Sequence, residues 1–424
     1  MTGLVAQSVG APWSRLLARV SPAHRRGLFG VGWTSLAQLA CMAIRLGSNL
    51  ILTRLLDPAA FGVFGTALAV LTTLDWLSDL GVQPALIRHP DGARREFLIT
   101  GWWMNLGRGL VLTVLAAALA YPLALAYGTP VLLPVLLALS LKPAFMGLRS
   151  PSMPMLRRTL NYRALFVDEV LQTIVATIVS VALAWATHSL WSIVLGTLAG
   201  AATCVAVSYV LCPTAPARAW DPIACREIGH LSRQVFFNTL IMALWMNLDR
   251  LLGLRWISAT DMGYYAVAYN LMYAIEALMR RGCDVYFSML SAYGDAHARD
   301  AWQRRISRAV AAWVMPVLAI AVATAPSIIG LMYDARYAAA KVLFGLLMAR
   351  LMVRTLGQVQ FQYLLALAQV RLNTQAYVVA LVVQAALFLP LVRTWGVTGL
   401  AVSALASTIT LGWMALGLTV LALQ

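Results

Sequence analysis

The sequence predicts an all-α, polytopic membrane protein of about twelve transmembrane helices, and two observations predict it. Of its 424 residues, 61% are hydrophobic and only 11% are charged, with a mean hydropathy of +0.77, whereas a soluble domain carries roughly 25% charged residues. The apolar segments reach about 20 residues, enough to cross a hydrocarbon core of roughly 30 Å. Because lipid offers the backbone no hydrogen bonds, such segments must satisfy their own and are therefore helices.

The expected spans follow from where the apolar segments begin and end. The fourth and tenth are interrupted by charged side chains, namely Lys142 in one and Arg350 and Arg354 in the other. The spans are expected near 29–52, 59–79, 97–120, 130–148, 164–186, 190–211, 233–254, 262–284, 309–330, 340–363, 373–392 and 397–422.

Residues 1–28 are expected to form a cytoplasmic leader rather than a cleavable signal, because they contain arginines but no signal-type apolar core. Trp13, Leu16, Leu17 and Val20 have helical spacing, which suits a short helix on an anionic membrane surface. A leader without fixed structure is an equally open alternative.

The distribution of Lys and Arg predicts the orientation. If the N-terminus is cytoplasmic, most of these residues fall in cytoplasmic segments, and the positive-inside rule is satisfied. Both termini are then cytoplasmic, in a bacterial inner membrane, and the net charge of +16 needs no nucleic acid partner. The opposite loops carry only Arg54, Arg255, Arg336, Lys341 and Arg393.

Metal and nucleophile chemistry have no support in the sequence. The five cysteines and five histidines are dispersed without metal-ligand spacing, and no HExxH, GxSxG or phosphate-binding glycine loop occurs. We therefore expect no catalytic residues, no metal and no cofactor.

A short repeat predicts two halves of six helices. Arg54 is followed eight positions later by Gly62, and Arg255 is followed eight positions later by Gly263, each glycine preceding two large side chains. Parallel repeats are related by an axis along the membrane normal, with substrate sites between them. Chance similarity of one short stretch is the alternative. The halves are expected at 29–211 and 233–424 around a central cavity, joined by a cytoplasmic linker at 212–232.

Five motifs occur in order along the chain, namely Arg54–Gly62, Ser78–Gly81, Leu156–Arg163, Asn247–Gly253 and Gly263–Tyr269. In these motifs the chain resembles the polysaccharide-exporter proteins of the MOP superfamily, whose members include lipid-linked oligosaccharide flippases of the Wzx type. The resemblance extends from about 25 to 290. It implies translocation of a polyprenyl-diphosphate-linked oligosaccharide for surface polysaccharide synthesis, as in lipopolysaccharide or exopolysaccharide assembly. Many relatives have fourteen helices, whereas this sequence predicts twelve. The resemblance therefore does not determine the subgroup of the family or the sugar composition of the substrate.

Polar side chains on the first span predict a cavity wall. Gln38, Cys41, Arg45 and Ser48 recur at helical spacing and form one seam. A charge within a span is costly and usually faces water or the bundle interior. The alternative is that Arg45 pairs with an acid on a neighbouring helix.

The tenth span carries a second stripe, formed by Arg350, Arg354, Gln358 and Gln362 in steps of four. Two arginines one turn apart repel unless an anion or a carboxylate lies between them. A diphosphate is such an anion, since the guanidinium group matches phosphate oxygens. In the alternative interpretation, both arginine side chains extend toward the lipid headgroups.

The remaining candidates lie in the third, seventh and eighth spans. Arg108 and Arg250 are assigned to substrate binding with the arginines above, although the glycines beside Arg108 also suit a packing contact. Asp249 and Glu276 are candidates for coupling to a proton or sodium gradient. Four acids of the second and fifth spans lie near an interface and are expected to pair with loop arginines. They are Asp75, Asp79, Asp168 and Glu169.

The function expected is a flippase, not an enzyme, with membrane lipids and other polysaccharide assembly proteins as further partners. One alternative is a drug-cation antiporter of the same superfamily, whose cavity should be acidic. Another is a membrane-embedded polymerase or glycosyltransferase, for which the short outer loops leave little room. A scaffold subunit of an assembly complex is a third.

Overall fold

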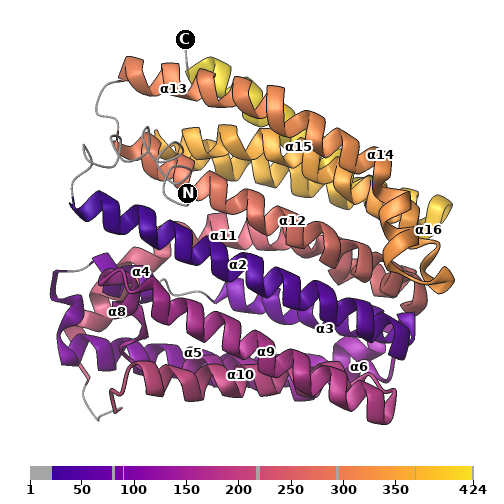
Figure 1. Ribbon diagram of the computed structural model, residues 1–424, viewed down its shortest axis with the longest axis horizontal. Helices are drawn as coiled ribbons and strands as arrows, with labels where there is room; N and C mark the ends of the chain where they lie inside the picture. Colours follow the sequence, from indigo (N-terminus) through magenta and orange to yellow (C-terminus); the bar gives the residue numbers. More distant parts are fainter. Residues whose placement is uncertain are drawn as a thin grey trace, which may run out of the picture.

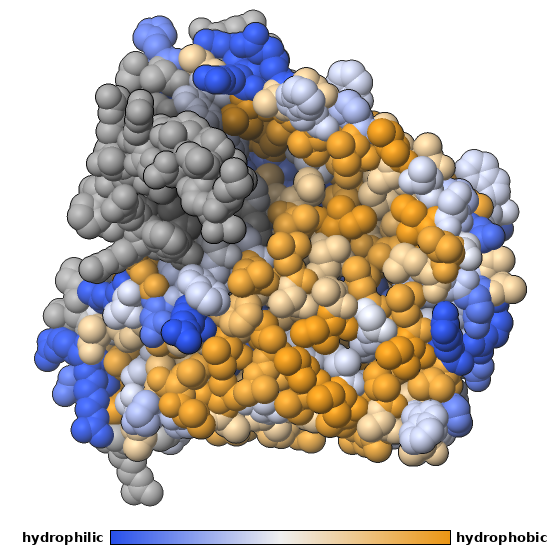
Figure 2. Space-filling view, in the orientation of Figure 1, coloured by the Kyte–Doolittle hydropathy of each residue, from blue (hydrophilic) through white to orange (hydrophobic). Residues whose placement is uncertain are grey.

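The computed structural model describes residues 22–78, 82–88, 90–215, 220–292, 296–367 and 369–422. Every regular element within these ranges is helical. The long helices run nearly parallel along the horizontal axis of Figure 1. In Figure 2 a band of hydrophobic side chains covers the middle of the visible face, and hydrophilic residues gather toward its left and right ends. This distribution is that of a bundle that crosses a membrane along the helix axes.

The N-terminal part of the chain contains the first six predicted spans. The fourth is broken at Ser140 into two short helices, because Pro143 has no backbone N–H to continue the first one. The elements are α2 (Pro22–Leu55), α3 (Pro58–Leu77), α4 (Val82–Arg88), η1 (Pro90–Ala93), α5 (Arg95–Tyr127), α6 (Leu132–Leu139), α7 (Leu141–Gly147), α8 (Met153–Arg158), α9 (Tyr162–Thr187) and α10 (Trp191–Leu211).

The C-terminal part contains the other six. The last two predicted spans form one hairpin-like element that reverses at Gly396, whose φ of 57° lies in the left-handed region. The elements are α11 (Pro222–Trp256), α12 (Ala259–Ala292), α13 (Ala296–Ala309), the π-helix η2 (Val310–Val314), α14 (Met315–Met332), η3 (Ala335–Tyr337), α15 (Ala340–Ala366) and α16 (Val370–Ala422).

Within the described residues, length and hydropathy identify eight helices that can cross a membrane, and α16 among them is long enough to do so twice. The pair α6–α7 and the more charged α11 and α12 complete the twelve predicted spans, which confirms the all-α fold class. Helix α11 already begins at Pro222, inside the segment predicted as a linker. The exact boundary between the halves stays a prediction. The predicted leader helix at 13–20 and the motif residues 79–81 lie outside the described residues.

The two halves meet where α3 and α12 begin, at the right of Figure 1. We call this end of the bundle the predicted outer end, because the charge distribution predicts that it faces away from the cytoplasm. A Cβ added to Gly62 would lie 2.1 Å from the Ala259 carbonyl oxygen, and one added to Gly263 would lie 1.8 Å from that of Pro58. Each glycine thus contacts the residue four positions before the other. This reciprocity is what a two-fold relation requires, and it supports the repeat inferred from the sequence.

Candidate functional site

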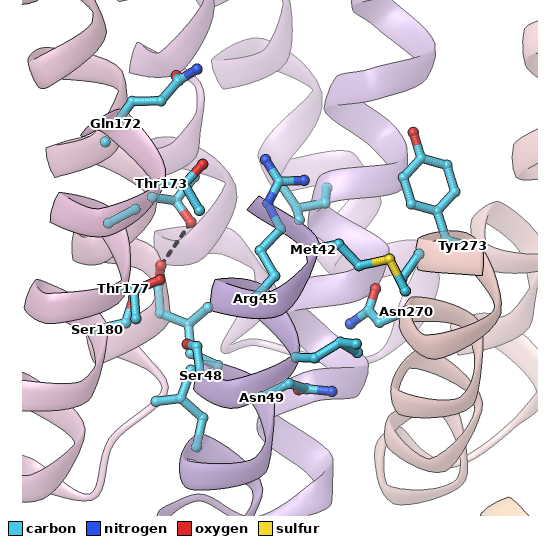
Figure 3. Close-up of a pocket in the computed structure, with 18 of the residues that line it drawn as sticks. Met42, Arg45, Ser48, Asn49, Gln172, Thr173, Thr177, Ser180, Asn270 and Tyr273 are labelled. Atoms are coloured by element: carbon cyan, nitrogen blue, oxygen red, sulfur yellow. Dashed lines mark hydrogen bonds between the residues drawn. The ribbon is translucent and has the colours of Figure 1, made fainter. Parts of the chain in front are cut away.

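A cavity of about 560 Å³ lies between α2, α3, α7, α9, α10 and α12, so it is walled by the N-terminal half and closed on one side by the C-terminal half. In Figure 3, Arg45 on α2 lies in the middle of this space, with Thr177 and its neighbours on α9 to one side and Tyr273 on α12 to the other. Its volume falls within the roughly 300–1,000 Å³ of small-molecule sites.

Helix α2 presents its polar seam to this cavity. Gln38, Arg45 and Ser48 line it, together with Asn49 on the same face. Cys41 lies on the edge of the seam and contacts α9 instead, with its thiol 3.4 Å from the Glu169 carbonyl oxygen. The seam predicted from spacing therefore divides between the cavity wall and the packing contact with α9.

Two cations of the cavity make no direct ion pair among the described residues. Within the described part of the chain, neither Arg45 nor Lys142 makes an ion pair, and no Asp or Glu occurs among the residues that line this cavity. Lys142 stands at the break between α6 and α7, which brings it into the cavity wall. Uncompensated positive charge inside a span is costly, so this cavity is suited to an anion.

Sequence reasoning did not assign Lys142 to the site. The signal was present, because Lys142 is one of two lysines in the chain and interrupts an otherwise apolar span directly before a proline. A charge beside a helix-breaking residue at membrane depth favours a cavity wall, since irregular backbone is tolerated where it faces water or protein.

In the C-terminal half, Arg350 is paired and enclosed. Its Nη1 lies 2.9 Å from a carboxylate oxygen of Asp249, and the two side chains are 3% and 0% exposed. The Tyr265 hydroxyl donates to the same carboxylate oxygen, and the Arg350 Nε donates to the Thr408 hydroxyl at 3.3 Å. Of the two counter-charges that the sequence left open for the tenth-span arginines, a bound anion or a carboxylate, Arg350 has the carboxylate. Its prediction as a residue of the cavity wall is wrong within the described structure, because the ion pair encloses it.

Arg354 is paired as well, but it also borders open space. Its Nη1 lies 3.0 Å from Oε1 of Glu276, and Nη2 of Arg280 lies 2.9 Å from the same oxygen. Arg354, Gln358 and Gln362 line a second cavity of about 290 Å³ within the C-terminal half. The tenth-span stripe thus runs from a buried ion pair into this smaller cavity.

The other two predicted arginines lie apart from both cavities. Arg250 packs over the ring of Tyr269 at 4.2 Å and donates to the Asn247 side chain at 2.5 Å. Arg108 pairs with Asp75 at the end of the N-terminal half that lies away from the predicted outer end. The structure therefore brings together Gln38 and Arg45 in one cavity and Arg354, Gln358 and Gln362 in another, and leaves Arg108, Arg250 and Arg350 in polar contacts elsewhere.

Both candidate coupling acids are engaged by arginines, Asp249 by Arg350 and Glu276 by Arg354 and Arg280. Of the four acids expected to pair with loop arginines, Asp168 does so, since its carboxylate lies 2.5 Å from Arg149. Asp75 pairs instead with Arg108, within α5. Glu169 makes no ion pair within the described residues, and Asp79 lies outside them. A search of the described residues finds no group of His, Cys, Asp and Glu arranged to hold a metal ion.

These observations define a class: a multi-pass membrane protein with two six-helix halves and a basic cavity. The chain belongs to the family described as polysaccharide biosynthesis protein, whose family model matches residues 51–342. The resemblance to a family of polysaccharide biosynthesis proteins is thereby confirmed.

Two curated relatives support this assignment. The chain is 27% identical over 118 residues to the lipopolysaccharide biosynthesis protein WzxC of Escherichia coli (strain K12), covering 28% of this chain and 24% of that one. It is 23% identical over 241 residues to the succinoglycan biosynthesis transport protein ExoT of Rhizobium meliloti (strain 1021), covering 56% and 48%. The chain thus spans about half or less of the length of these relatives.

Solved structures share the fold at low identity. The lipid II flippase MurJ in an inward closed conformation matches with a TM-score of 0.76 and 12% identity, covering 91% of this chain and 87% of that one. An inward-facing multidrug resistance MATE family transporter of the MOP superfamily matches with a TM-score of 0.72 and 13% identity, covering 92% and 99%. These likenesses show the fold alone.

Proposed function

We propose that this protein is a flippase that moves a polyprenyl-diphosphate-linked oligosaccharide across the bacterial inner membrane for surface polysaccharide synthesis. The observation that carries the proposal is the pair of cations, Arg45 and Lys142, that share one cavity without a carboxylate partner among the described residues. Family membership supports the polysaccharide class of substrate.

The chemistry of the substrate matches the cavity. A diphosphate cannot enter hydrocarbon unaided, because an ionised group loses its hydration there at high cost. Fixed guanidinium and ammonium groups replace part of that hydration, and arginine offers several donors to phosphate oxygens. We assign the diphosphate to Arg45 and Lys142.

The rest of the wall suits a sugar. Gln38, Gln172, Thr177 and Asn270 line the same cavity as the two cations and supply neutral donors and acceptors. Amide and hydroxyl side chains can exchange hydrogen bonds with sugar hydroxyls without adding charge. The lipid tail would remain in the bilayer while the headgroup occupies the cavity.

Contacts at the predicted outer end support an alternating-access cycle. The Gly62–Gly263 contact joins the two halves there. The Asn49 amide donates to the Tyr333 hydroxyl at 2.9 Å, and Arg336 donates to the Arg54 carbonyl oxygen at 3.1 Å. These contacts would separate when the halves rock and the cavity opens outward, with both termini on the cytoplasmic side.

A basic cavity argues against the drug-cation antiporter. A cationic substrate would require acidic or aromatic walls, whereas the charges among the described lining residues are both positive. Coupling to a proton or sodium gradient through Asp249 or Glu276 would require an arginine to release the acid first.

The test is complementation in cells that lack the chromosomal gene. Arg45→Ala and Lys142→Ala, singly and together, are expected to reduce surface polysaccharide strongly at matched membrane levels, with the double variant most affected. Arg305→Ala, which removes an exposed arginine of α13, is the control and is expected to behave as wild type. Normal polysaccharide in the double variant would overturn the proposal.

A further inference from the structure

The second cavity, in the C-terminal half, has the chemistry of an anion site. It is lined by Arg280 and Arg354, by the amides of Gln358, Gln362 and Asn373, and by apolar side chains that include Phe361. No Asp or Glu occurs among the described residues that line it. At about 290 Å³ it lies near the lower limit of small-molecule sites, roughly 300 Å³. That size suits a phosphate-bearing group better than an oligosaccharide.

The two arginines converge on one oxygen behind this cavity. Arg280 donates to Oε1 of Glu276 at 2.9 Å, and Nη1 of Arg354 lies 3.0 Å from the same oxygen as an ion pair. Oε2 of this carboxylate is buried and has no hydrogen-bond partner among the described residues. Glu276 is 1% exposed. A carboxylate that satisfies two guanidinium groups with one oxygen and leaves the other unpaired is incompletely held, since an ionised carboxylate can accept about four hydrogen bonds.

Aromatic rings fix the positions of these arginines. The guanidinium of Arg354 lies 5.4 Å from the ring centroid of Trp245, and that of Arg280 lies 5.8 Å from that of Tyr273. Such contacts hold a guanidinium in place without neutralising it. The two arginines therefore remain available to another anion if the Glu276 carboxylate leaves.

Helix α12 connects this cavity to the one in the N-terminal half. Asn270, Tyr273 and Ala277 follow one another at helical spacing and line the larger cavity, whereas Glu276 and Arg280 lie on the adjoining face. Figure 1 shows α12 between α2 and α15. A headgroup bound in the larger cavity is thus separated from the second one by the side chains of a single helix.

We propose that the C-terminal cavity is a second site for a phosphate or diphosphate group, and that the Glu276 carboxylate holds the place of that anion in this conformation. The proposal rests on the proposed function for the class of anion, but it concerns a different cavity. The N-terminal site attracts an anion directly, while the C-terminal site accepts one only by displacing Glu276. With the carboxylate in place, Glu276, Arg280 and Arg354 carry a net charge of +1, and displacement of the carboxylate leaves the two arginines with a charge of +2.

The experiment measures binding of inorganic pyrophosphate to the purified full-length protein at fixed ionic strength. Arg45→Ala with Lys142→Ala removes the N-terminal site and serves as the background. In this background Glu276→Gln is expected to tighten pyrophosphate binding by about tenfold or more, because the competing charge is gone and coupling energies of close charge pairs commonly exceed that factor. Adding Arg354→Ala should abolish the gain.

Three controls keep the test decisive. Glu96→Gln, at an exposed acid in the first turn of α5, should leave binding unchanged. Gln358→Glu adds a carboxylate to the cavity wall without touching the Glu276 pair, and should weaken binding in the background protein even if Glu276→Gln folds poorly. Comparison of pyrophosphate with farnesyl diphosphate distinguishes a free anion from a lipid headgroup, since only the latter gains from a prenyl chain.

An unchanged affinity in Glu276→Gln, or a gain that survives Arg354→Ala, would overturn the second site. The assay requires no transport. Failure of the C-terminal site is therefore distinguishable from failure of the flippase proposal, which is tested by polysaccharide levels in the Arg45 and Lys142 variants.

Discussion

The two halves of this protein treat buried positive charge in opposite ways. In the N-terminal half, Arg45 and Lys142 border a cavity with no carboxylate partner in the described residues. In the C-terminal half, Arg350 and Arg354 lie against Asp249 and Glu276 at 2.9 and 3.0 Å. Related six-helix units thus carry similar residues in different electrostatic settings.

In this conformation the difference separates cations that are free to bind an anion from cations that a carboxylate already occupies. A buried ion pair is stable only while both partners remain, so its loss damages the bundle. An unpaired cation in a cavity contributes nothing to folding and is retained at a cost, which indicates a ligand. Substitutions in the buried ion pairs should therefore reduce mainly the stability of the bundle. Substitutions of the unpaired cavity cations should reduce mainly transport.

The largest effect on stability is expected at the Asp249–Arg350 pair. Asp249→Ala leaves a fully buried guanidinium without a counter-charge, which costs about 3–5 kcal/mol. The thermal unfolding midpoint of the purified protein should fall sharply, and so should the amount recovered from membranes. Adding Arg350→Met to an Asp249→Leu protein should restore much of the loss, because two apolar side chains then replace the pair. A midpoint for Asp249→Ala equal to wild type would contradict the pairing.

A smaller loss is expected where the halves touch. Gly263→Ala places a Cβ 1.8 Å from the Pro58 carbonyl oxygen, and relieving such an overlap requires a backbone shift that costs about 1–3 kcal/mol. Unfolding midpoints should show the loss. Gly47→Ala is the matched control, since nothing lies within 4 Å of its added Cβ. Equal behaviour of the two variants would mean that the halves do not approach at Gly263.

The fold could be predicted from the sequence because its signals are local. Apolar segments mark each span, and the spacing of Arg54 to Gly62 and Arg255 to Gly263 marks the repeat. Even the reversal in α16 falls at the expected break between spans, where Gly396 adopts a positive φ. Each of these features depends on neighbouring residues alone.

The site could be predicted only in part, because partners on other helices decide it. The stripe of Arg350 and Arg354 required an anion or a carboxylate, and only the structure shows the carboxylates, one of them 101 positions away in the chain. Arg45 was assigned to a cavity wall from its seam and lies in one. Lys142 was missed because a lone lysine in a weak span has no periodic pattern to interpret.

A modest effect is expected from the polar contact between α2 and the end of α14. Tyr333→Phe removes the hydrogen bond that the Asn49 amide donates to the hydroxyl at 2.9 Å, and such a bond contributes about 0.5–1.5 kcal/mol. The midpoint should fall slightly, and amide exchange at the predicted outer end should rise. Tyr121→Phe, at an exposed tyrosine of α5, is the control. A drop as large as that of Asp249→Ala would require a role for Tyr333 beyond this bond.

The smallest effect on stability is expected from the two cavity cations, although their effect on transport is the greatest. Arg45→Ala with Lys142→Ala breaks no ion pair within the described structure. The free energy of unfolding should therefore change by no more than about 0.5 kcal/mol, and the unfolding midpoint should stay close to that of the wild type. It should rise if relief of uncompensated charge outweighs lost packing. The measurement is thermal unfolding of the same preparation used for polysaccharide complementation. A fall comparable to that of Asp249→Ala would show that these cations have structural partners, and the contrast between the halves would then disappear.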